Sequence, residues 1–407
     1  MLKLKTHSAR RWTPTLVATL IAASVVLSVS MGVRQSLGLF LTPVAVGTGI
    51  SVASFGLVIA FQNLVWGISQ PAIGAIADRY GGLVVVLVGS ILLAGGLFMM
   101  TLGSETALYV GGGLVIGIAV AATSHGVLVG IISRQATDDL RNLSVSILAS
   151  AGALGTFLIA PSAQALLNRF SWETSLLILA VLAFSMVTFA PLLRDQSSTG
   201  ETAFAERPDA LAAIRRACSH PGFVIMTLAF FACGFQLTFV ATHLPNYVAI
   251  CGLPPSVGAS AIALIGLFNA FGTYFAGKLG EVYGHKLVLA GIYALRTLAI
   301  AVYASLPASQ ESTLIFGAAM GLLWLSVIAP VSNLLHSMFG STNFGTLFGI
   351  MFFSHQVGAF LGAYVGGLSF DVTSDYTVAW LSLVFVGALA AAMQYKMNET
   401  PQKPRAA

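Results

Sequence analysis

Two arginines stand inside long apolar stretches of this sequence. Arg296 follows Lys286 by ten residues, which at about 1.5 Å of helical rise per residue places it about 15 Å along a helix. That depth is near the middle of a lipid bilayer, whose hydrocarbon core is about 30 Å thick. Arg34 lies past the middle of its own stretch. A charge at such depth costs about 2.5 to 3.5 kcal/mol on insertion scales, so it usually faces a cavity and marks a substrate path.

The chemistry of these two cations predicts an anionic substrate. No Asp or Glu stands inside an apolar stretch, so the counter-charge is expected to come from the substrate. A guanidinium presents a planar fork that matches a carboxylate, which favours a small organic carboxylate over a cationic or lipophilic drug. Phosphate esters remain open as substrates. For Arg34 the structural alternative is snorkelling to the outer interface, and for Arg296 it is an ion pair, for which no stretch supplies the acid.

Uncharged polar side chains in the same stretches are candidates to complete the site. We predict substrate-binding roles, beside Arg34 and Arg296, for Gln164, Gln236, Asn269, His355 and Gln356; Gln62, Asn63, His125 and Asn333 are further intramembrane polar residues. Hydrogen bonds between helices are the alternative role for each of them. His355 differs from the rest because an imidazole changes charge near neutral pH, as a proton-coupled carrier requires.

The amino-acid composition indicates that the helices carrying these polar residues are surrounded by lipid. Of 407 residues, 8% are charged and 57% are hydrophobic, and the mean hydropathy is +0.89. Soluble proteins carry about 25% charged residues, so this chain must face lipid. A helix needs about 20 apolar residues to cross a bilayer. Twelve stretches qualify, at 13–44, 51–73, 83–103, 107–131, 143–167, 174–193, 222–248, 256–277, 287–306, 312–336, 344–367 and 376–395.

One long polar stretch divides these twelve segments into two sets of six. The predicted fold is an all-α membrane protein with twelve transmembrane helices in two pseudo-symmetric six-helix bundles. The bundles are assigned to residues 1–193 and 222–395, joined by a cytoplasmic linker at 194–221 and followed by a cytoplasmic tail at 396–407. Within the linker, residues 208–218 are compatible with a short amphipathic helix on the membrane surface or with a solvated connection.

The basic residues predict the orientation of the chain. With both termini in the cytoplasm, every Lys and Arg except Arg34, Arg169 and Arg296 falls on the cytoplasmic side, as expected from the positive-inside rule. The basic residues behind the net charge of +5 are therefore spread over the cytoplasmic loops and tails of a membrane protein. This distribution does not indicate nucleic-acid binding. We predict a multi-pass protein of the plasma membrane, the inner membrane of a bacterium, acting as a monomer.

A sequence motif recurs at half the chain length. Gly74, Asp78, Arg79 and Gly81 after the second stretch correspond to Gly277, Glu281 and Gly284 after the eighth, at an offset of 203. The first and seventh stretches align as well and pair Arg34 with Gln236, so the halves are predicted to be copies. Duplicated six-helix halves around a midplane site are a recurrent transporter plan.

The Gly-x-x-x-Asp-Arg-x-Gly pattern, with its degenerate copy, resembles the signature loop of the major facilitator superfamily. This resemblance covers the whole chain and implies the major facilitator fold. It also implies a gating role for the two loops, in which the acid holds the cytoplasmic side shut against neighbouring helix ends. A carboxylate is attracted to a helix N-terminus, which agrees with that role.

Within the superfamily, the chain is similar to the monocarboxylate porter and oxalate–formate exchanger branch. The fifth stretch, from Ala149 to Gln164, carries the resemblance, together with Trp172 after it and the basic Arg34 late in the first stretch. The eighth stretch has Asn269 and Thr273 where animal monocarboxylate porters carry an Asp and, four residues later, an Arg. The animal scheme of proton coupling therefore does not carry over residue by residue.

These observations predict a secondary active transporter of a small organic anion, a monocarboxylate, that works by alternating access. Proton coupling through His355, another histidine or the substrate itself, anion exchange and facilitated diffusion are all open. The alternatives are a facilitator-type exporter or antiporter of another solute, including dicarboxylate exchange and drug or metabolite efflux, and a transporter-like sensor. No Walker motif, nucleophile elbow or metal-ligand spacing occurs, so we predict no enzyme activity, cofactor or metal. The expected partners are the anion, protons and the bilayer.

Overall fold

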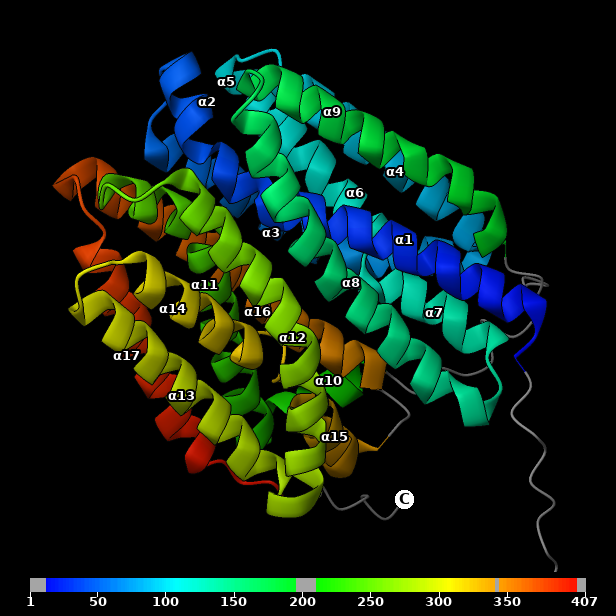
Figure 1. Cartoon of the computed structure of the whole chain (residues 1–407). Helices are drawn as coiled ribbons and strands as arrows, with labels where there is room; N and C mark the ends of the chain where they lie inside the picture. Colours follow the sequence, from blue (N-terminus) through cyan, green and yellow to red (C-terminus); the bar gives the residue numbers. More distant parts are fainter. Residues whose placement is uncertain (1–11, 195–209, 341–343, 401–407) are drawn as a thin grey trace, which may run out of the picture.

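A computed structural model of the chain describes residues 12–194, 210–340 and 344–400, and this part is built from helices and short connections (Figure 1). It contains 12 helical segments that are long and apolar enough to cross a membrane. The predicted all-helical fold with twelve spans is confirmed. The chain crosses back and forth, so the start of α1 and the end of α17 lie on one face, here called the terminal face. The other is called the opposite face.

The first six spans form the N-terminal half. Span 1 joins α1 (Pro14–Ser36), a 3₁₀ turn η1 (Leu37–Phe40) and α2 (Leu41–Thr48). Spans 2 and 3 are α3 (Val52–Tyr80) and α4 (Gly82–Met100). Span 4 consists of α5 (Glu105–Ala107), the π-helical η2 (Leu108–Val115), α6 (Ile116–Thr123) and α7 (His125–Gln135). Span 5 is α8 (Asp138–Leu167), and span 6 joins α9 (Trp172–Ser185) to η3 (Met186–Leu193).

The last six spans form the C-terminal half, after a short helix α10 (Ala210–Cys218) in the linker. The linker thus contains the helix that the sequence left open. Spans 7, 8 and 9 are α11 (Pro221–Ile250), α12 (Pro255–Tyr283) and α13 (His285–Ser305). Span 10 is made of α14 (Gln310–Leu323) and α15 (Ile328–Phe339). Spans 11 and 12 are α16 (Phe344–Thr373) and α17 (Thr377–Tyr395).

Local chemistry sets where the helices begin and end. The hydroxyls of Ser51 and Ser309 accept backbone N–H groups in the first turns of α3 and α14, which satisfies donors that a helix start leaves free. Gly81 and Gly284 end α3 and α12 with the same positive φ of 85°, which residues with a side chain rarely adopt. The two signature loops therefore turn in the same way, as the repeat predicted.

The two halves pack internally by the same contacts, which supports a duplicated origin. A Cβ added to Gly155 of α8 would collide with the backbone of Ser28 in α1. A Cβ added to Gly358 of α16 would collide with the backbone of Phe231 in α11. Both residues of the second pair are 203 positions after those of the first. Glycine is needed at each place because two helix backbones approach within side-chain distance.

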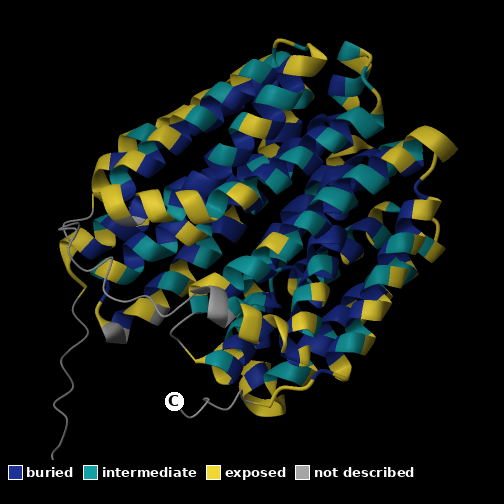
Figure 2. Cartoon of the chain, turned by 180° about the vertical axis from the view of Figure 1, so that it is seen from behind, coloured by how far each residue is buried: buried dark blue, intermediate teal, exposed yellow. Residues whose placement is uncertain are grey.

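The distribution of apolar side chains fits a protein surrounded by lipid. Buried residues fill the interior (Figure 2). Many of the exposed positions are large apolar side chains. Val181, Ile315 and Phe385 expose 66%, 69% and 70% of their surface. A soluble protein seldom leaves so many large apolar side chains uncovered.

Two stretches predicted as continuous helices are interrupted near the middle of their spans. Span 4 breaks at Ser124, whose ψ of 174° is extended, and span 10 breaks between Leu323 and Ile328. In span 10 the cause is Pro330, which has no N–H and whose ring collides with the carbonyl four residues earlier in a regular helix. In span 4 the hydroxyls of Thr123 and Ser124 bond to preceding carbonyls and so compete with the helix ladder.

Candidate substrate site at the interface of the two halves

Arg34 lies in the last turn of α1 and keeps its positive charge unpaired among the described residues. Its Nη1 donates to Oε1 of Gln35 at 2.9 Å, and its Nη2 donates to Oδ1 of Asn63 in α3 at 2.6 Å. The Nε atom is buried and has no partner in the part of the chain that the structure describes. The guanidinium lies over the indole of Trp66, 4.7 Å from the ring centroid. These acceptors are neutral amides and a ring, so they position the cation without neutralising it.

A small cavity opens beside Arg34 and is lined by both halves of the protein. Its volume is about 10 Å³, enough for about one water molecule. The N-terminal half contributes Arg34, Gln35, Leu37, Gly38, Ile59 and Gln62, and α11 of the C-terminal half contributes Thr238, Ala241 and Thr242. The cation therefore faces the interface at which the halves of a transporter move.

Arg296 has a different environment, inside the C-terminal half. Its side chain is fully buried in α13. Its Nη2 donates to the carbonyls of Leu323 and Trp324, the latter at 2.9 Å. These carbonyls end α14 where span 10 breaks, and a cation is favourable at a helix C-terminus. Nη1 and Nε of Arg296 are buried and have no partner in the described part of the chain.

The helix break in span 10 is held by Asn269, and the break in span 4 has a matching contact. Oδ1 of Asn269 accepts the N–H of Leu325 at 3.0 Å. In the N-terminal half, Oε1 of Gln70 accepts from the hydroxyl of Ser124 at 3.0 Å and from the indole of Trp66 at 2.8 Å. In both halves the second span thus supports the break in the fourth. Paired discontinuous helices at equivalent positions are typical of a transporter binding region.

A chain of polar contacts joins the surroundings of the two arginines. Nε2 of Gln356 donates to the backbone carbonyl of Asn63 at 3.1 Å. Oε1 of Gln356 lies 3.0 Å from Nδ1 of His355. Both His355 and Arg296 lie close enough to the thiol of Cys233 in α11 to interact with it electrostatically. The predicted residues His355 and Gln356 thus take part in contacts between the surroundings of Arg34 and Arg296, together with Asn63, which the sequence offered as a further polar candidate. Trp66 and Cys233 are contacts that the sequence prediction did not include.

The side-chain amides of Gln164 and Gln236 donate to partners outside this chain of contacts. Nε2 of Gln164 donates to Asn168 at 2.9 Å near the end of α8. Nε2 of Gln236 donates to the carbonyl of Leu383 at 3.1 Å, between α11 and α17. Neither is among the residues that line the cavity beside Arg34.

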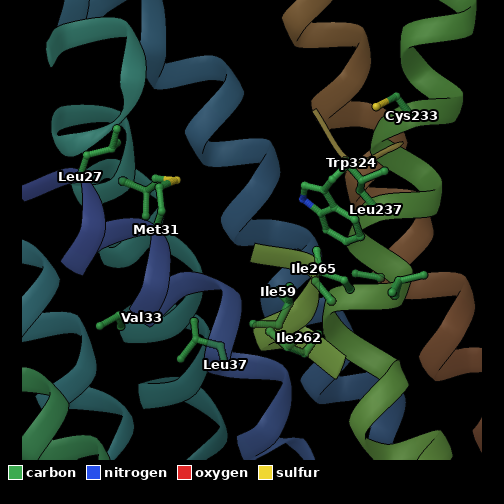
Figure 3. Packing of buried hydrophobic residues seen from close by; sticks show 14 of the residues in the cluster. Leu27, Met31, Val33, Leu37, Ile59, Cys233, Leu237, Ile262, Ile265 and Trp324 are labelled. Atoms are coloured by element: carbon green, nitrogen blue, oxygen red, sulfur yellow. The ribbon is translucent and has the colours of Figure 1, made fainter. Parts of the chain in front are cut away.

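Buried apolar side chains surround the polar contacts. Figure 3 shows Leu27 and Met31 of α1 and Leu37 of η1 on one side of this region, and Cys233 and Leu237 of α11 on the other. No acidic side chain that the structure describes is buried. The interior of the described chain therefore offers two guanidinium groups and no carboxylate.

The contacts that join the two halves are concentrated toward the opposite face. There Thr42 donates to Asn246 at 2.7 Å, and the N–H of Ala53 donates to Asp371 at 3.1 Å. Toward the terminal face, a Cβ added to Gly74 of α3 or Gly349 of α16 would have no atom within 4 Å. The structure thus represents a state that is closed on the opposite face and loosely packed toward the terminal face.

The signature loops lie on the terminal face, where this state has few contacts. Arg79 places its guanidinium 5.3 Å from the ring centroid of Tyr80. Glu281 is paired with Lys278 at 3.1 Å, and both side chains are exposed. The Asp78 side chain lies outside the described part of the structure. The contact of Glu281 within its own loop fits a state in which this face is not held shut.

Twelve spans, paired helix breaks and a cation at the interface of the halves define a membrane transporter. The sequence model of the Major Facilitator Superfamily matches residues 20–363. The chain belongs to this family, whose members are transporters and not enzymes.

Two curated proteins and one solved structure illustrate the similarity. A rat protein named monocarboxylate transporter 13 is 27% identical over 367 residues, which cover 89% of this chain and 83% of that protein. The oxalate:formate antiporter of Oxalobacter formigenes is 21% identical and covers 93% of this chain and 89% of its own length. The crystal structure of the nucleoside transporter NupG superposes with a TM-score of 0.76 at 15% identity, over 95% of this chain and 99% of that one. This structural likeness concerns the fold alone.

Proposed function

We propose that this protein transports a small organic monocarboxylate, with Arg34 as the residue that binds its carboxylate. The observation that carries the proposal is the unpaired guanidinium in a cavity shared by both halves. A substrate carboxylate bound in this cavity would give Arg34 a charged acceptor in place of the neutral amide oxygens. Charge-assisted hydrogen bonds are roughly twice as strong as neutral ones. The names of the two curated relatives point to small organic carboxylates: monocarboxylates for the rat protein, and oxalate and formate for the bacterial antiporter.

Arg296 is proposed as the second cation of the site. Its Nη1 and Nε are donors without a partner among the described residues, and the break in span 10 beside it is a place where the helix can move. Gln356 and His355 take part in contacts between the surroundings of the two arginines, where they would contact the part of the substrate beyond its carboxylate. Gln164, Gln236 and Asn269 are proposed to affect substrate binding indirectly, by holding the helices that carry them in position.

The proposed setting is the plasma membrane, the inner membrane in a bacterium, with both termini in the cytoplasm. The distribution of Lys and Arg supports this orientation, so the opposite face would point outward. Asp78 and Glu281 are proposed to hold the cytoplasmic face shut in the alternate state. The protein is proposed to work as a monomer, coupled to protons or exchanging anions.

Uptake into proteoliposomes tests the proposal. The purified full-length protein is reconstituted and supplied with labelled mono- and dicarboxylates, with and without a pH gradient and with and without internal anion. We expect saturable monocarboxylate uptake that Arg34→Gln weakens by about 10- to 100-fold in apparent affinity, because a hydrogen bond to a charged group contributes about 1.5 to 3 kcal/mol.

The matched control is Arg169→Gln, which removes an exposed arginine from the opposite face and is expected to leave uptake unchanged. Monocarboxylate uptake by Arg34→Gln at the parental affinity would show that this residue is not the ligand. Uptake that requires internal anion and ignores the pH gradient identifies exchange as the mode of transport.

A further inference from the structure

A second histidine, distinct from His355, is buried where the two halves close. His243 in α11 is fully buried and directly follows Thr242, which lines the cavity beside Arg34. Its Nε2 lies 2.7 Å from the carbonyl oxygen of Ala363 in α16. Its Nδ1 lies 3.3 Å from the hydroxyl of Tyr376, just before α17. No substrate contact proposed above uses this residue.

A neutral imidazole satisfies the hydrogen bonds of His243 in this state. A carbonyl oxygen only accepts, so Nε2 carries the proton and Nδ1 is the acceptor. Nδ1 then accepts from the Tyr376 hydroxyl, which itself accepts from Nδ2 of Asn246 at 2.7 Å. Each of these groups is satisfied. A second proton on Nδ1 would face a hydroxyl that already accepts from Asn246, and the hydroxyl hydrogen would lose its partner.

The closed opposite face also covers the ring with the N-terminal half. A Cβ added to Gly56 of α3 would lie 3.4 Å from the His243 ring and 2.8 Å from the Ala363 carbonyl oxygen. On the other side, Asn246 accepts from Thr42 of the N-terminal half at 2.7 Å. Alternating access requires these contacts to separate when the opposite face opens. That separation exposes the imidazole to water.

Few ionisable groups surround this ring. Among the described residues, Asp371, near the end of α16, is the acidic residue that interacts electrostatically with His243. Tyr376 contacts the ring directly, and Tyr247 of α11 packs edge-on against Tyr376 with centroids 6.2 Å apart. The facing segment of α3, residues 52–63, has no ionisable side chain. In the closed state Asp371 is engaged by the N–H of Ala53, and separation of the halves would free it.

We propose that His243 binds the coupling proton of the transport cycle: it is neutral while the opposite face is closed and takes a proton from water on that side when the face opens. Burial disfavours the imidazolium, and opening both hydrates the ring and releases Asp371 to stabilise its charge. A protonated empty carrier then resists closure. An anion at Arg34, beside the same segment of α11, offsets the added charge and permits the loaded carrier to close. This inference deepens the proposed function by naming the site of proton coupling.

The test follows the conformation of the substrate-free protein, so it does not depend on knowing the anion. The three native cysteines are replaced by Ser, and spin labels are attached at Val46→Cys in α2 and Leu306→Cys at the end of α13, which are exposed on the opposite face in different halves. Pulsed electron paramagnetic resonance gives the distance distribution in full-length protein in nanodiscs between pH 5 and 8.5. One proton linked to opening changes the ratio of open to closed protein by up to about tenfold per pH unit.

We expect the open population to rise as the pH falls, to lose this dependence in His243→Gln, and to keep it in His355→Gln. A pH-independent distribution in the parent, or an unchanged response in His243→Gln, would overturn the proposal. If His243→Gln does not fold, histidine C2-hydrogen exchange of the parent protein, followed by mass spectrometry, gives the titration of His243 directly. A midpoint that coincides with the conformational transition supports the proposal, and the absence of titration over this pH range refutes it. If only the carboxylate uptake assay failed, the spin-label and histidine-exchange measurements would still test this proposal, because neither uses a substrate.

Discussion

Replacement of Asn63 by Asp should block substrate binding by giving Arg34 an internal anion. Asn63 Oδ1 already accepts from Nη2 of Arg34 at 2.6 Å, and Asp has nearly the same shape. Two unit charges about 4 Å apart attract by about 4 kcal/mol at an effective dielectric constant of about 20. A substrate carboxylate must compete with that pair, so its apparent affinity should fall by up to about 1,000-fold.

The assay is proteoliposome uptake over a wide range of monocarboxylate concentrations, combined with thermal unfolding without substrate. Asn63→Asp should unfold no earlier than the parent, because the new pair replaces a neutral hydrogen bond. Gln35→Glu should behave alike, since Gln35 is the other acceptor of this guanidinium, at 2.9 Å. The control is Asn333→Asp, on an exposed side chain that donates to the carbonyl of Ala329 in its own helix. Parental affinity in Asn63→Asp would refute the assignment of Arg34 as the anion ligand.

Three further changes test the closed face, the helix break and the repeat. Asp371→Asn weakens the contact with the N–H of Ala53 and should raise the population that is open on the opposite face, measured with the same spin labels. Asn269→Leu leaves the N–H of Leu325 without its acceptor and should lower the free energy of unfolding by about 1 to 3 kcal/mol, measured by denaturant titration. Gly358→Ala should prevent close packing of α11 on α16 and abolish stable expression, measured as monodisperse protein after purification.

Each of these changes has a matched control in the same chain. Asp375→Asn alters a carboxylate that caps α17 within its own half and should leave the spin-label distances unchanged. Asn333→Leu removes an exposed amide and should preserve stability. Gly291→Ala adds a Cβ where no atom lies within 4 Å and should express normally. Equal effects in a variant and its control would contradict the contact assigned to that variant.

The fold could be predicted from the sequence because a bilayer imposes strong rules on a chain. Each crossing needs about 20 apolar residues, and charges between crossings report the boundaries. The repeated motif also predicted that the two halves are related, and the structure agrees in that Gly81 and Gly284 have the same positive φ. These signals are local in the sequence, so they do not depend on how the helices pack.

The site was only partly predictable, because its contacts join helices distant in sequence. Arg34 and Arg296 are predicted site residues because of their depth in apolar stretches, and Arg34 also because of the family resemblance. Hydropathy does not reveal an interruption of the helix backbone, so the breaks at Ser124 and after Leu323 were not predicted. The carbonyls that accept from Arg296 lie at the second of these breaks and were therefore not predicted either. Asn63 was one polar residue among several until the packing of α3 on α1 placed it against Arg34.

The two arginines that look equivalent in the sequence are not equivalent in the structure. One Nη atom of Arg296 is already engaged by the carbonyls at the end of α14, in a fully buried place. Arg34 is held by neutral amides beside a cavity that both halves line. A single accessible guanidinium offers one planar fork, which pairs with one carboxylate. A second carboxylate on the substrate would have to reach Arg296, whose Nη2 is already engaged by the carbonyls at the end of α14, and would carry the cost of desolvation in that buried place. This asymmetry favours a monoanion over a dianion, so dicarboxylates should compete poorly in the uptake assay.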